Sequence, residues 1–401
     1  MLDRIKKRIM NRLDMTREIS DQEIIEIIDE EVCIYAKEET VSLAERKNMR
    51  NQVFYALRKL DILQELAEDD TITEIMVNGP DHIFFERYGK ISRWDKGFSS
   101  KEKLEDIIQQ IVGNNNRMVN TASPIVDTRL SDGSRVNVVL SPIAIDGACL
   151  SIRKFPKEPL RMNHLIEQNS IGVKPAQLLK RLVQAGYNIF VSGGTGSGKT
   201  TFLNALSEFI PKEERVITIE DSAELQIKEI ENLVRLETRN ANTQGGSEIT
   251  MRDLIKTALR MRPSRIIVGE IRGAEALDML QAMNTGHNGS LCTGHANNAQ
   301  DMLSRIETMV LMGMELPIVA IRAQIAAGID ILVHLARMRD KSRRVVEITE
   351  VDRFQNGEIR LNSIYEFREI GENEEVIIGN WEQIGSLNHK EKLLATGIEL
   401  E

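Results

Sequence analysis

The stretch Gly193-Gly194-Thr195-Gly196-Ser197-Gly198-Lys199-Thr200 fits the pattern G-x-x-x-x-G-K-[ST], and a second hydroxyl residue, Thr201, follows it directly. An apolar segment, 188–191, precedes the glycines, and a segment with helical spacing of apolar residues, 201–210, follows them. A strand, a glycine-rich loop and a helix in this order are the context that a phosphate-binding loop requires. The sequence therefore predicts a loop between a strand and a helix that can hold phosphate groups.

The residue types of this loop suit a nucleoside triphosphate. Glycines allow positive φ angles, so that successive backbone N–H groups converge on phosphate oxygens at the positive end of a helix dipole. Lys199 can place its charge on the β- and γ-phosphates, and Thr200 can offer its hydroxyl to Mg²⁺. The alternative is a glycine-rich turn with an incidental lysine, which the flanking strand and helix disfavour. We expect residues 193–201 to bind ATP with Mg²⁺.

Length and composition set the class of protein. A chain of 401 residues with 41% hydrophobic content predicts two or three globular domains. No apolar stretch approaches the roughly 18 residues that cross a bilayer, and the start, 1–14, lacks the apolar middle of a secretory signal. We therefore expect the chain to remain in the cytosol.

Charge and cysteine content exclude two further classes of site. Cys33, Cys149 and Cys292 are odd in number and far apart, which argues against a disulfide framework and against a zinc site. The formal net charge of −9 argues against a surface devoted to nucleic acid, so no nucleic-acid partner is expected.

Changes in the spacing of apolar residues and in proline content divide the chain into four regions. Apolar residues at helical spacing predict an N-terminal helical region over 1–67. Short β-like segments around a helix at 100–112 predict an α+β domain over 68–158. Proline-marked Pro156–Pro159 and a polar helical stretch near 163–169 indicate a hinge, and 159–173 is assigned as the linker. From 174 to 401, alternating helices and strands predict an α/β domain with a mostly parallel sheet, ending in a β-hairpin that turns at 355–357.

Residues 1–17 are basic, with Leu2, Ile5, Ile9 and Leu13 at helical spacing. One interpretation is peripheral contact with an anionic membrane surface. The other, which we favour, is a helix packed on its neighbours with a solvated charged face.

Carboxylates follow two apolar strands downstream of the loop. Strand 215–219 ends in Glu220-Asp221-Ser222-Ala223-Glu224, and strand 265–268 ends in Gly269-Glu270. In open parallel sheets, ligands bind at the carboxyl ends of the strands. Glu270 is therefore the preferred acid to hold the Mg²⁺ shell or to orient and polarise an attacking water. The alternative for these acids is that they begin or cap the helix that follows.

A third apolar segment, 289–297, contains a strand that ends in His295. A single histidine is more often structural than catalytic, but the strand-end position favours contact with the terminal phosphate.

These motifs together resemble the secretion ATPases of the type II and type IV secretion and pilus superfamily, and within it the CpaF-type ATPases of Tad/Flp pilus assembly. The resemblance covers nearly the whole chain. Residues 193–201 match the Walker A motif, 220–225 the Asp box, 268–272 the Walker B motif with a Glu in place of the commoner Asp, and 293–297 the His box. Gly294 stands where a bulkier residue is usual. Two segments of the α+β domain, 129–135 and 150–155, also match this subgroup.

The resemblance implies a RecA-like P-loop NTPase domain and roles for single residues. Glu224 and Glu270 would handle the metal and the water, and His295 would report the phosphate state. Arginines of the α+β domain would reach the nucleotide when the two domains close, namely Arg129, Arg135 and Arg153. The alternative for each is a surface arginine on a strand. Arg239 and Arg262 are weaker candidates for contacts between subunits.

The function that the resemblance implies is ATP hydrolysis by a homo-hexameric motor at the cytoplasmic face of the membrane. The motor would act on inner-membrane platform proteins to power pilus assembly or protein secretion. Two alternatives stay open. One is a nucleotide-regulated scaffold with little turnover, and the other is a conjugative DNA-transfer ATPase, whose mark would be salt-sensitive DNA binding.

Overall fold

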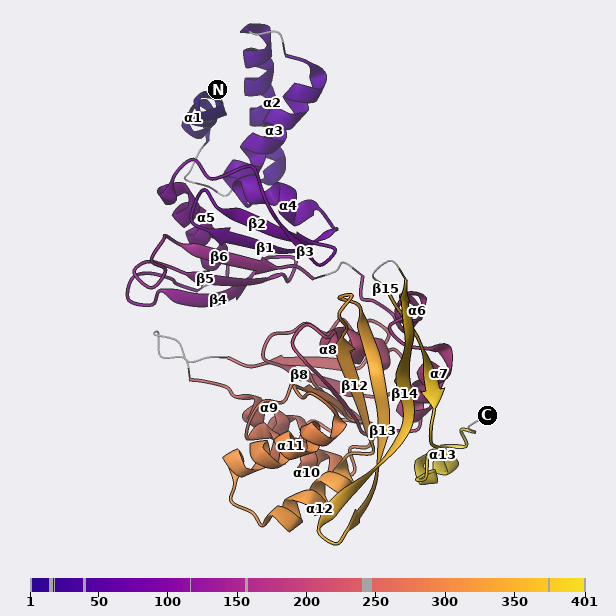
Figure 1. The fold of residues 1–401 in the computed structure, drawn as a ribbon. Coiled ribbons are helices and arrows are strands. Elements are labelled where there is room, and N and C mark those ends of the chain that lie inside the picture. Colours follow the sequence, from indigo (N-terminus) through magenta and orange to yellow (C-terminus); the bar gives the residue numbers. More distant parts are fainter. Residues whose placement is uncertain are drawn as a thin grey trace. The chain divides into compact units, whose positions relative to one another are not determined.

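The computed structural model describes residues 2–13, 17, 19–38, 41–115, 117–155, 158–239, 247–373 and 376–399 (Figure 1). The chain divides into two compact units, Met1–Lys157 and Glu158–Glu401. Of the predicted hinge at Pro156–Pro159, residues 156 and 157 lie outside the described residues.

The first unit begins with three helices that share one core. They are α1 (Leu2–Arg12), α2 (Asp21–Glu38) and α3 (Leu43–Arg58). Ile5 and Ile9 of α1 are only 2% and 0% exposed in this core. The predicted apolar stripe of the N-terminus is therefore buried against its neighbours, which supports the packed-helix interpretation and is against membrane contact through that stripe. Residues 1, 14–16 and 18 of this segment lie outside the described part of the chain.

The rest of the first unit is the predicted α+β arrangement, a six-stranded antiparallel sheet in the order β3-β2-β1-β6-β5-β4. Alternate strand residues and the apolar face of the helix α5 form its core. Its elements are η1 (Asp61–Leu63), α4 (Gln64–Glu68), β1 (Ile72–Asn78), β2 (Ile83–Arg87), β3 (Lys90–Arg93), α5 (Lys101–Gly113), β4 (Ile125–Arg129), β5 (Arg135–Val139) and β6 (Cys149–Arg153).

The second unit is built on a nine-stranded sheet in the order β15-β14-β13-β12-β7-β11-β10-β8-β9 (Figure 1). Strands β12, β7, β11, β10, β8 and β9 are parallel to one another, whereas β13, β14 and β15 each pair antiparallel with the preceding strand. The strands are β7 (Ile189–Gly193), β8 (Val216–Glu220), β9 (Leu233–Glu237), β10 (Arg265–Val268), β11 (Leu291–Gly294), β12 (Ile331–Arg337), β13 (Arg343–Gln355), β14 (Glu358–Asn373) and β15 (Val376–Gln383).

Helices cover both faces of this sheet, because alternate residues of the buried strands enter two separate cores. One core contains residues of α6 (Met162–Glu167), α7 (Val173–Gln184), α8 (Lys199–Ser207) and α13 (Glu391–Thr396). The other contains residues of α9 (Met251–Ala258), α10 (Glu275–Asn284), α11 (Ala299–Gly313) and α12 (Ile318–Gly328). The predicted α/β class is confirmed.

The structure contains both the C-terminal hairpin and the short helix that the sequence predicts for this unit. The hairpin is confirmed, since Gln355 pairs with Glu358 around Asn356 and Gly357, which have φ angles of 55° and 82°. The helical stretch expected near 163–169 within the linker is present as α6, which buries Met162 and Leu165 in the core. The apolar pair at this spacing holds the segment on the second unit. The wider division into four regions stays a prediction.

Among the described helices, none is by itself long and apolar enough to cross a membrane. Helices α11 and α12 reach the required length and apolar composition only when taken together, and they meet at a bend of 119°.

Candidate functional site

The predicted phosphate-binding loop joins β7 to α8, as its sequence predicts. A Cβ atom at Gly193 would lie 2.4 Å from the carbonyl oxygen of Leu335, so only glycine fits there. Gly196 and Gly198 have φ angles of 72° and 92°, which other residues rarely adopt. Gly198 is the N-cap of α8 and offers no side-chain cap to the first-turn N–H groups. This cradle fits a phosphate group at a helix N-terminus.

Lys199 is buried beneath the loop, with 7% of its surface exposed. Its Nζ donates to the carbonyl oxygens of Gly193 at 3.1 Å and of Gly194 at 2.9 Å. Burial lowers the pKa of the Lys199 ammonium, while the charge of Glu270 acts in the opposite direction. The ammonium is held at the inner wall of the loop, where a bound phosphate chain would lie.

Glu270 follows β10 and lies within reach of two cationic or polar groups. Its Oε2 accepts a hydrogen bond from Nη2 of Arg272 at 2.9 Å, and its Oε1 is 2.8 Å from Nε2 of His295. Burial alone would raise the pKa of Glu270, but the Arg272 hydrogen bond and the charges of Arg272 and Lys199 outweigh it and lower that pKa. Glu270 is therefore an ionised, partly buried carboxylate.

His295 connects the loop to this carboxylate. Its Nδ1 is 3.3 Å from Nζ of Lys199, and its Nε2 faces Glu270. Burial lowers the pKa of His295 below its ordinary value despite the nearby carboxylate. A neutral imidazole can accept from Lys199 at Nδ1. Its Nε2 lies close to Oε1 of Glu270 without hydrogen-bond alignment, and that oxygen has no hydrogen-bond partner in the described residues. Lys199, His295 and Glu270 thus form a chain of close contacts at the carboxyl ends of β7, β11 and β10.

Glu220, the last residue of β8, is a buried carboxylate for which the motifs predict no separate role. It is 3% exposed, and its Oε1 accepts the backbone N–H groups of Glu224 at 2.8 Å and Leu225 at 3.0 Å. Its Oε2 has no hydrogen-bond partner in the described parts of the chain. Burial raises the pKa of Glu220 to about 7. Its position as the final residue of an apolar strand was the signal that could have singled it out.

Glu224 lies next to this carboxylate, since its backbone N–H donates to Glu220, whereas Thr200 directly follows Lys199 at the start of α8. Glu224 comes four residues after β8 and is half-buried, and Thr200 is the second residue of α8. In the described residues no group of three or more His, Cys, Asp or Glu side chains is arranged to hold a metal ion by itself. A Mg²⁺ ion here would therefore depend on phosphate oxygens, on the Thr200 hydroxyl and on water, with the unpartnered oxygen of Glu220 able to accept from that water. The residues fit such an ion.

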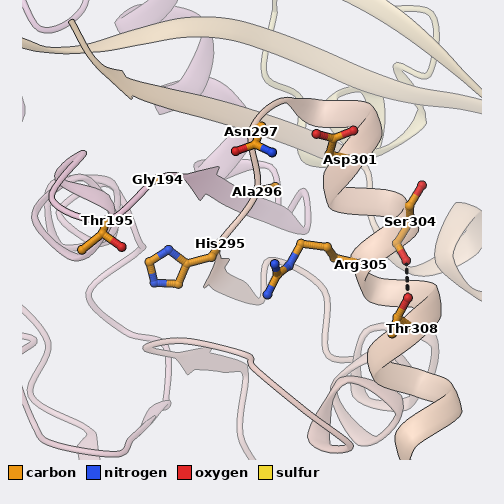
Figure 2. Close-up of a pocket in the computed structure, with 9 residues that line it drawn as sticks. All are labelled: Gly194, Thr195, His295, Ala296, Asn297, Asp301, Ser304, Arg305 and Thr308. Carbon is orange, nitrogen blue, oxygen red and sulfur yellow. Dashed lines mark hydrogen bonds between the residues drawn. The ribbon is translucent and has the colours of Figure 1, made fainter.

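The loop opens onto a pocket of about 520 Å³ (Figure 2). Figure 2 shows Thr195 and His295 on one side of it and Arg305 of α11 on the other. The lining residues are Gly194, Thr195, His295, Ala296, Asn297, Asp301, Ser304, Arg305 and Thr308. Of the loop, Gly194 and Thr195 line the pocket, and Ser197 Oγ donates to the carbonyl of Gly194 at 2.9 Å. The pocket gives the Lys199–His295–Glu270 chain access to solvent.

The three predicted arginines of the first unit lie in one row. Arg129 pairs in register with Arg135 across β4 and β5, and Arg135 pairs with Arg153 across β5 and β6. On β5, Val136 and Val138 point into the core. Arg135 alternates with them along the strand, so it and the two arginines paired with it share the opposite face of the sheet. The structure brings these side chains together, and their role toward a nucleotide stays a prediction.

The two weaker candidates, Arg239 and Arg262, belong to the second unit. The guanidinium of Arg239 donates to the carbonyl oxygen of Ser247 through Nε at 3.2 Å and Nη2 at 3.0 Å. Arg262 has a positive φ of 56° in the turn before β10. Their interface roles stay predictions.

Comparison with known proteins agrees with the motifs. The sequence profile of the family described as "Type II/IV secretion system protein" matches residues 56–394. The type IV secretion system protein PtlH of Bordetella pertussis is 33% identical over 72% of this chain and 93% of its own length. A Mycobacterium tuberculosis protein, Rv3659c, with a provisional conjugal-transfer name, is 36% identical over 72% of this chain and 83% of its own.

Solved structures share the fold. The Legionella pneumophila ATPase DotB superposes with a TM-score of 0.54 at 23% identity, covering 72% of this chain and 80% of its own. The pilus retraction motor PilT with bound ADP has a TM-score of 0.50 at 18% identity, covering 76% of this chain and 81% of its own. The matched family profile, together with the loop, the strand-end acids and the histidine, shows that this chain belongs to the type II/IV secretion system protein family.

Proposed function

We propose that this protein hydrolyses ATP with Mg²⁺ and couples the reaction to mechanical work in a pilus or secretion apparatus. The observation that carries the proposal is the chain from Lys199 through His295 to Glu270, with separations of 3.3 and 2.8 Å, at the mouth of the glycine loop. A phosphate-binding loop alone makes a binding protein, whereas an ionised acid beside it can serve hydrolysis.

Lys199, His295 and Glu270 each have a distinct task in this proposal. The Lys199 ammonium, now on the carbonyls of Gly193 and Gly194, pairs with the phosphate chain. Glu270 is ionised and can therefore orient a water and accept its proton. Bound Mg²⁺ supplies neutralisation of the phosphate charge. Thr200 and Glu224 contribute to its ligand shell, and neutral His295 responds to the terminal phosphate.

The arginine row of the first unit supplies further positive charge in this proposal. Arg129, Arg135 and Arg153 act on the nucleotide when the two units close, since a planar guanidinium binds phosphate oxygens in bidentate fashion. The shared exposed face and register of the three side chains are consistent with one anionic partner.

The finer assignment rests on resemblance. We propose a homo-hexamer at the cytoplasmic face of the inner membrane that acts on platform proteins of a Tad/Flp pilus or a secretion system. The names of PtlH and PilT, one a type IV secretion protein and the other a pilus retraction motor, support this class of machine.

A conjugative DNA-transfer ATPase is the second candidate, favoured by the provisional conjugal-transfer name of Rv3659c. The net charge of −9 disfavours direct DNA binding. DNA binding that weakens steeply as salt rises would favour this candidate over the first.

Steady-state phosphate release tests the catalytic assignment. We expect Glu270→Gln to lower turnover about a thousandfold, because it removes an ionised acid beside the phosphate site, while ADP binding is retained. Lys199→Ala should abolish nucleotide binding. Glu358→Gln, on an exposed position of β14, is the matched control and should leave both unchanged.

Turnover that persists in Glu270→Gln while Lys199→Ala loses nucleotide would contradict the role of Glu270. A wild-type chain that binds nucleotide and does not turn it over would instead favour the nucleotide-regulated scaffold.

A further inference from the structure

The hairpin formed by β12 and β13 runs past the phosphate-binding loop. Strand β12 pairs in parallel with β7, with His334 opposite Ser192 and Leu335 opposite Gly193. Two residues beyond Leu335, Arg337 faces Arg343 across the β12–β13 pair. The strand pairing therefore carries two arginines to the edge of the loop, and nothing in the predicted motifs includes them.

Both arginines lie close to the loop glycines. A Cβ atom at Gly196 would lie 3.7 Å from Nη1 of Arg337, and one at Gly198 would lie 3.3 Å from Cδ of Arg343. The side chains of Arg337 and Arg343 are exposed to solvent. Within the described ranges, the Arg337 guanidinium makes no hydrogen bond or ion pair of its own. Its charge is thus placed over the loop and is not used for stability.

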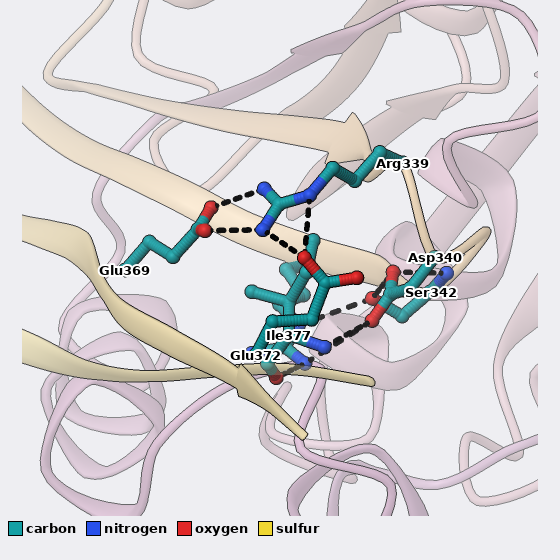
Figure 3. A network of polar contacts seen from close by, with 7 residues as sticks. Arg339, Asp340, Ser342, Glu369, Glu372 and Ile377 are labelled. Atoms are coloured by element: carbon teal, nitrogen blue, oxygen red, sulfur yellow. Dashed lines mark hydrogen bonds and ion pairs between the residues drawn. The ribbon is translucent and has the colours of Figure 1, made fainter. Parts of the chain in front are cut away.

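The turn between the two arginines is fixed by a separate polar network (Figure 3). Asp340 accepts from the backbone N–H of Ser342 at 2.9 Å and from its hydroxyl at 2.6 Å, and from the backbone N–H of Ile377 on β15 at 2.9 Å. Burial opposes ionisation of Asp340, but these hydrogen bonds outweigh it and hold its pKa below the ordinary value.

A second set of contacts ties the same turn to β14 and β15. Arg339 donates to the carboxylates of Glu369 and Glu372, and Arg344 donates through Nη2 to the carbonyl oxygen of Ile377 at 2.6 Å. The negative charges of Glu369 and Glu372 are paired with Arg339 and do not reach across to neutralise Arg337. The network therefore holds the backbone of the turn in place and leaves the charge of Arg337 for another partner.

We propose that Arg337 and Arg343 bind the phosphate chain of the nucleotide held by the loop of the same chain. The proposal rests on the proposed function. Guanidinium groups suit this task because they present several N–H donors in one plane to phosphate oxygens and stay charged at every physiological pH. The glycine at 198 leaves room for Arg343, because a Cβ atom there would lie only 3.3 Å from its Cδ, and Arg337 lies within contact distance of Gly196.

Calorimetric titration of the full chain with ADP, AMP and adenosine tests the proposal. We expect Arg337→Gln/Arg343→Gln to weaken ADP binding about tenfold or more, because two charge-assisted contacts are lost. The loss should be smaller for AMP and absent for adenosine. The melting temperature without ligand should stay close to that of the wild type, because both side chains are exposed.

The chain offers a matched control at the other end of the same strand. Arg353 and Arg360 are also exposed arginines that face each other in register, across β13 and β14. Arg353→Gln/Arg360→Gln removes the same charge from the same sheet and should leave ADP binding unchanged.

The outcomes separate this inference from the function on which it rests. If the wild type and the control bind ADP and the Arg337/Arg343 variant binds it equally well, the inference is wrong and the proposed function stands. An equal loss for adenosine and ADP would also overturn it, since the arginines would then not act on phosphate. A wild-type chain that binds no nucleotide would overturn both.

Discussion

The parallel strands of the second unit bury charged and polar groups at both ends, but they use them differently. At the carboxyl ends, which we call the site end, lie Lys199, Glu220, Glu270 and His295. At the amino ends, which we call the anchor end, lie Asn188, Glu214, Arg265, Asp330 and Lys392. The contrast between the two ends separates groups that stabilise the fold from groups that await a ligand.

The anchor end satisfies its polar groups within the protein. Arg265 is 2% exposed, and its guanidinium donates to both carboxylate oxygens of Glu214 and to the carbonyl of Val183. Asn188 uses its backbone N–H, its side-chain amide and its side-chain carbonyl in three hydrogen bonds of 2.7 to 3.0 Å. Such saturated networks fix a fold, because each member would be costly to leave unpaired.

At the site end, some buried polar groups lack a hydrogen-bond or ion-pair partner within the described residues. Glu220 keeps one buried oxygen without a partner, and its pKa is raised by burial. Lys199 is buried against neutral carbonyl oxygens, so its positive charge has no carboxylate in direct contact. These arrangements cost stability, which is expected where groups are held for binding or catalysis. Removing a group should therefore have opposite consequences at the two ends.

The largest effect on stability is expected at the anchor end. Arg265→Ala should lower the free energy of unfolding by about 4 kcal/mol, because it leaves Glu214 and a backbone carbonyl without their buried partner. Urea unfolding followed by Trp381 fluorescence measures this. A Trp94→Phe background leaves Trp381, in the second unit, as the single tryptophan reporter.

Arg353→Ala, which removes an arginine side chain that is 68% exposed, is the control and should change stability little. An equal, small effect of both substitutions would remove the distinction on which the comparison rests.

A smaller change in stability, of opposite sign, is expected when Glu220 is replaced by glutamine. Its folded-state pKa is near 7, above the ordinary 4.5, so the folded protein keeps a proton that the unfolded chain releases. The resulting stability is fully present below about pH 4.5 and is lost as pH rises through 7. Glu220→Gln, which stays neutral, should therefore be more stable than the wild type at pH 8.5 by about 2 kcal/mol.

Urea unfolding of both proteins from pH 5 to pH 8.5 measures the difference, which should shrink toward acid. A difference that is constant with pH would show that Glu220 does not carry this titration.

Much of the site end was predictable from the sequence, because its signals are local. The glycine loop has a fixed spacing, and Glu270 and His295 each follow a short apolar strand. The Asn356-Gly357 turn likewise has a direct conformational cause in its two positive φ angles.

The rest depends on contacts between distant segments. The sequence did not predict β9, whose partly exposed residues lack a continuous apolar run, or β15, an edge strand with alternating exposure. It could not rank Glu220 above Glu224, because only packing against Gly269 and the N–H groups of 224 and 225 buries Glu220. The arginines at 337 and 343 reach the loop only through strand pairing across more than 130 positions.

Thermal unfolding of Lys199→Ala, with and without ADP and Mg²⁺, tests the central claim that the site end is built for a nucleotide and not for stability. We predict that without nucleotide the variant melts at the wild-type temperature or slightly above it, because a buried charge is removed, and that nucleotide raises the melting temperature of the wild type only. A large fall in the melting temperature of Lys199→Ala without nucleotide would contradict the claim, since Lys199 would then stabilise the fold as Arg265 does.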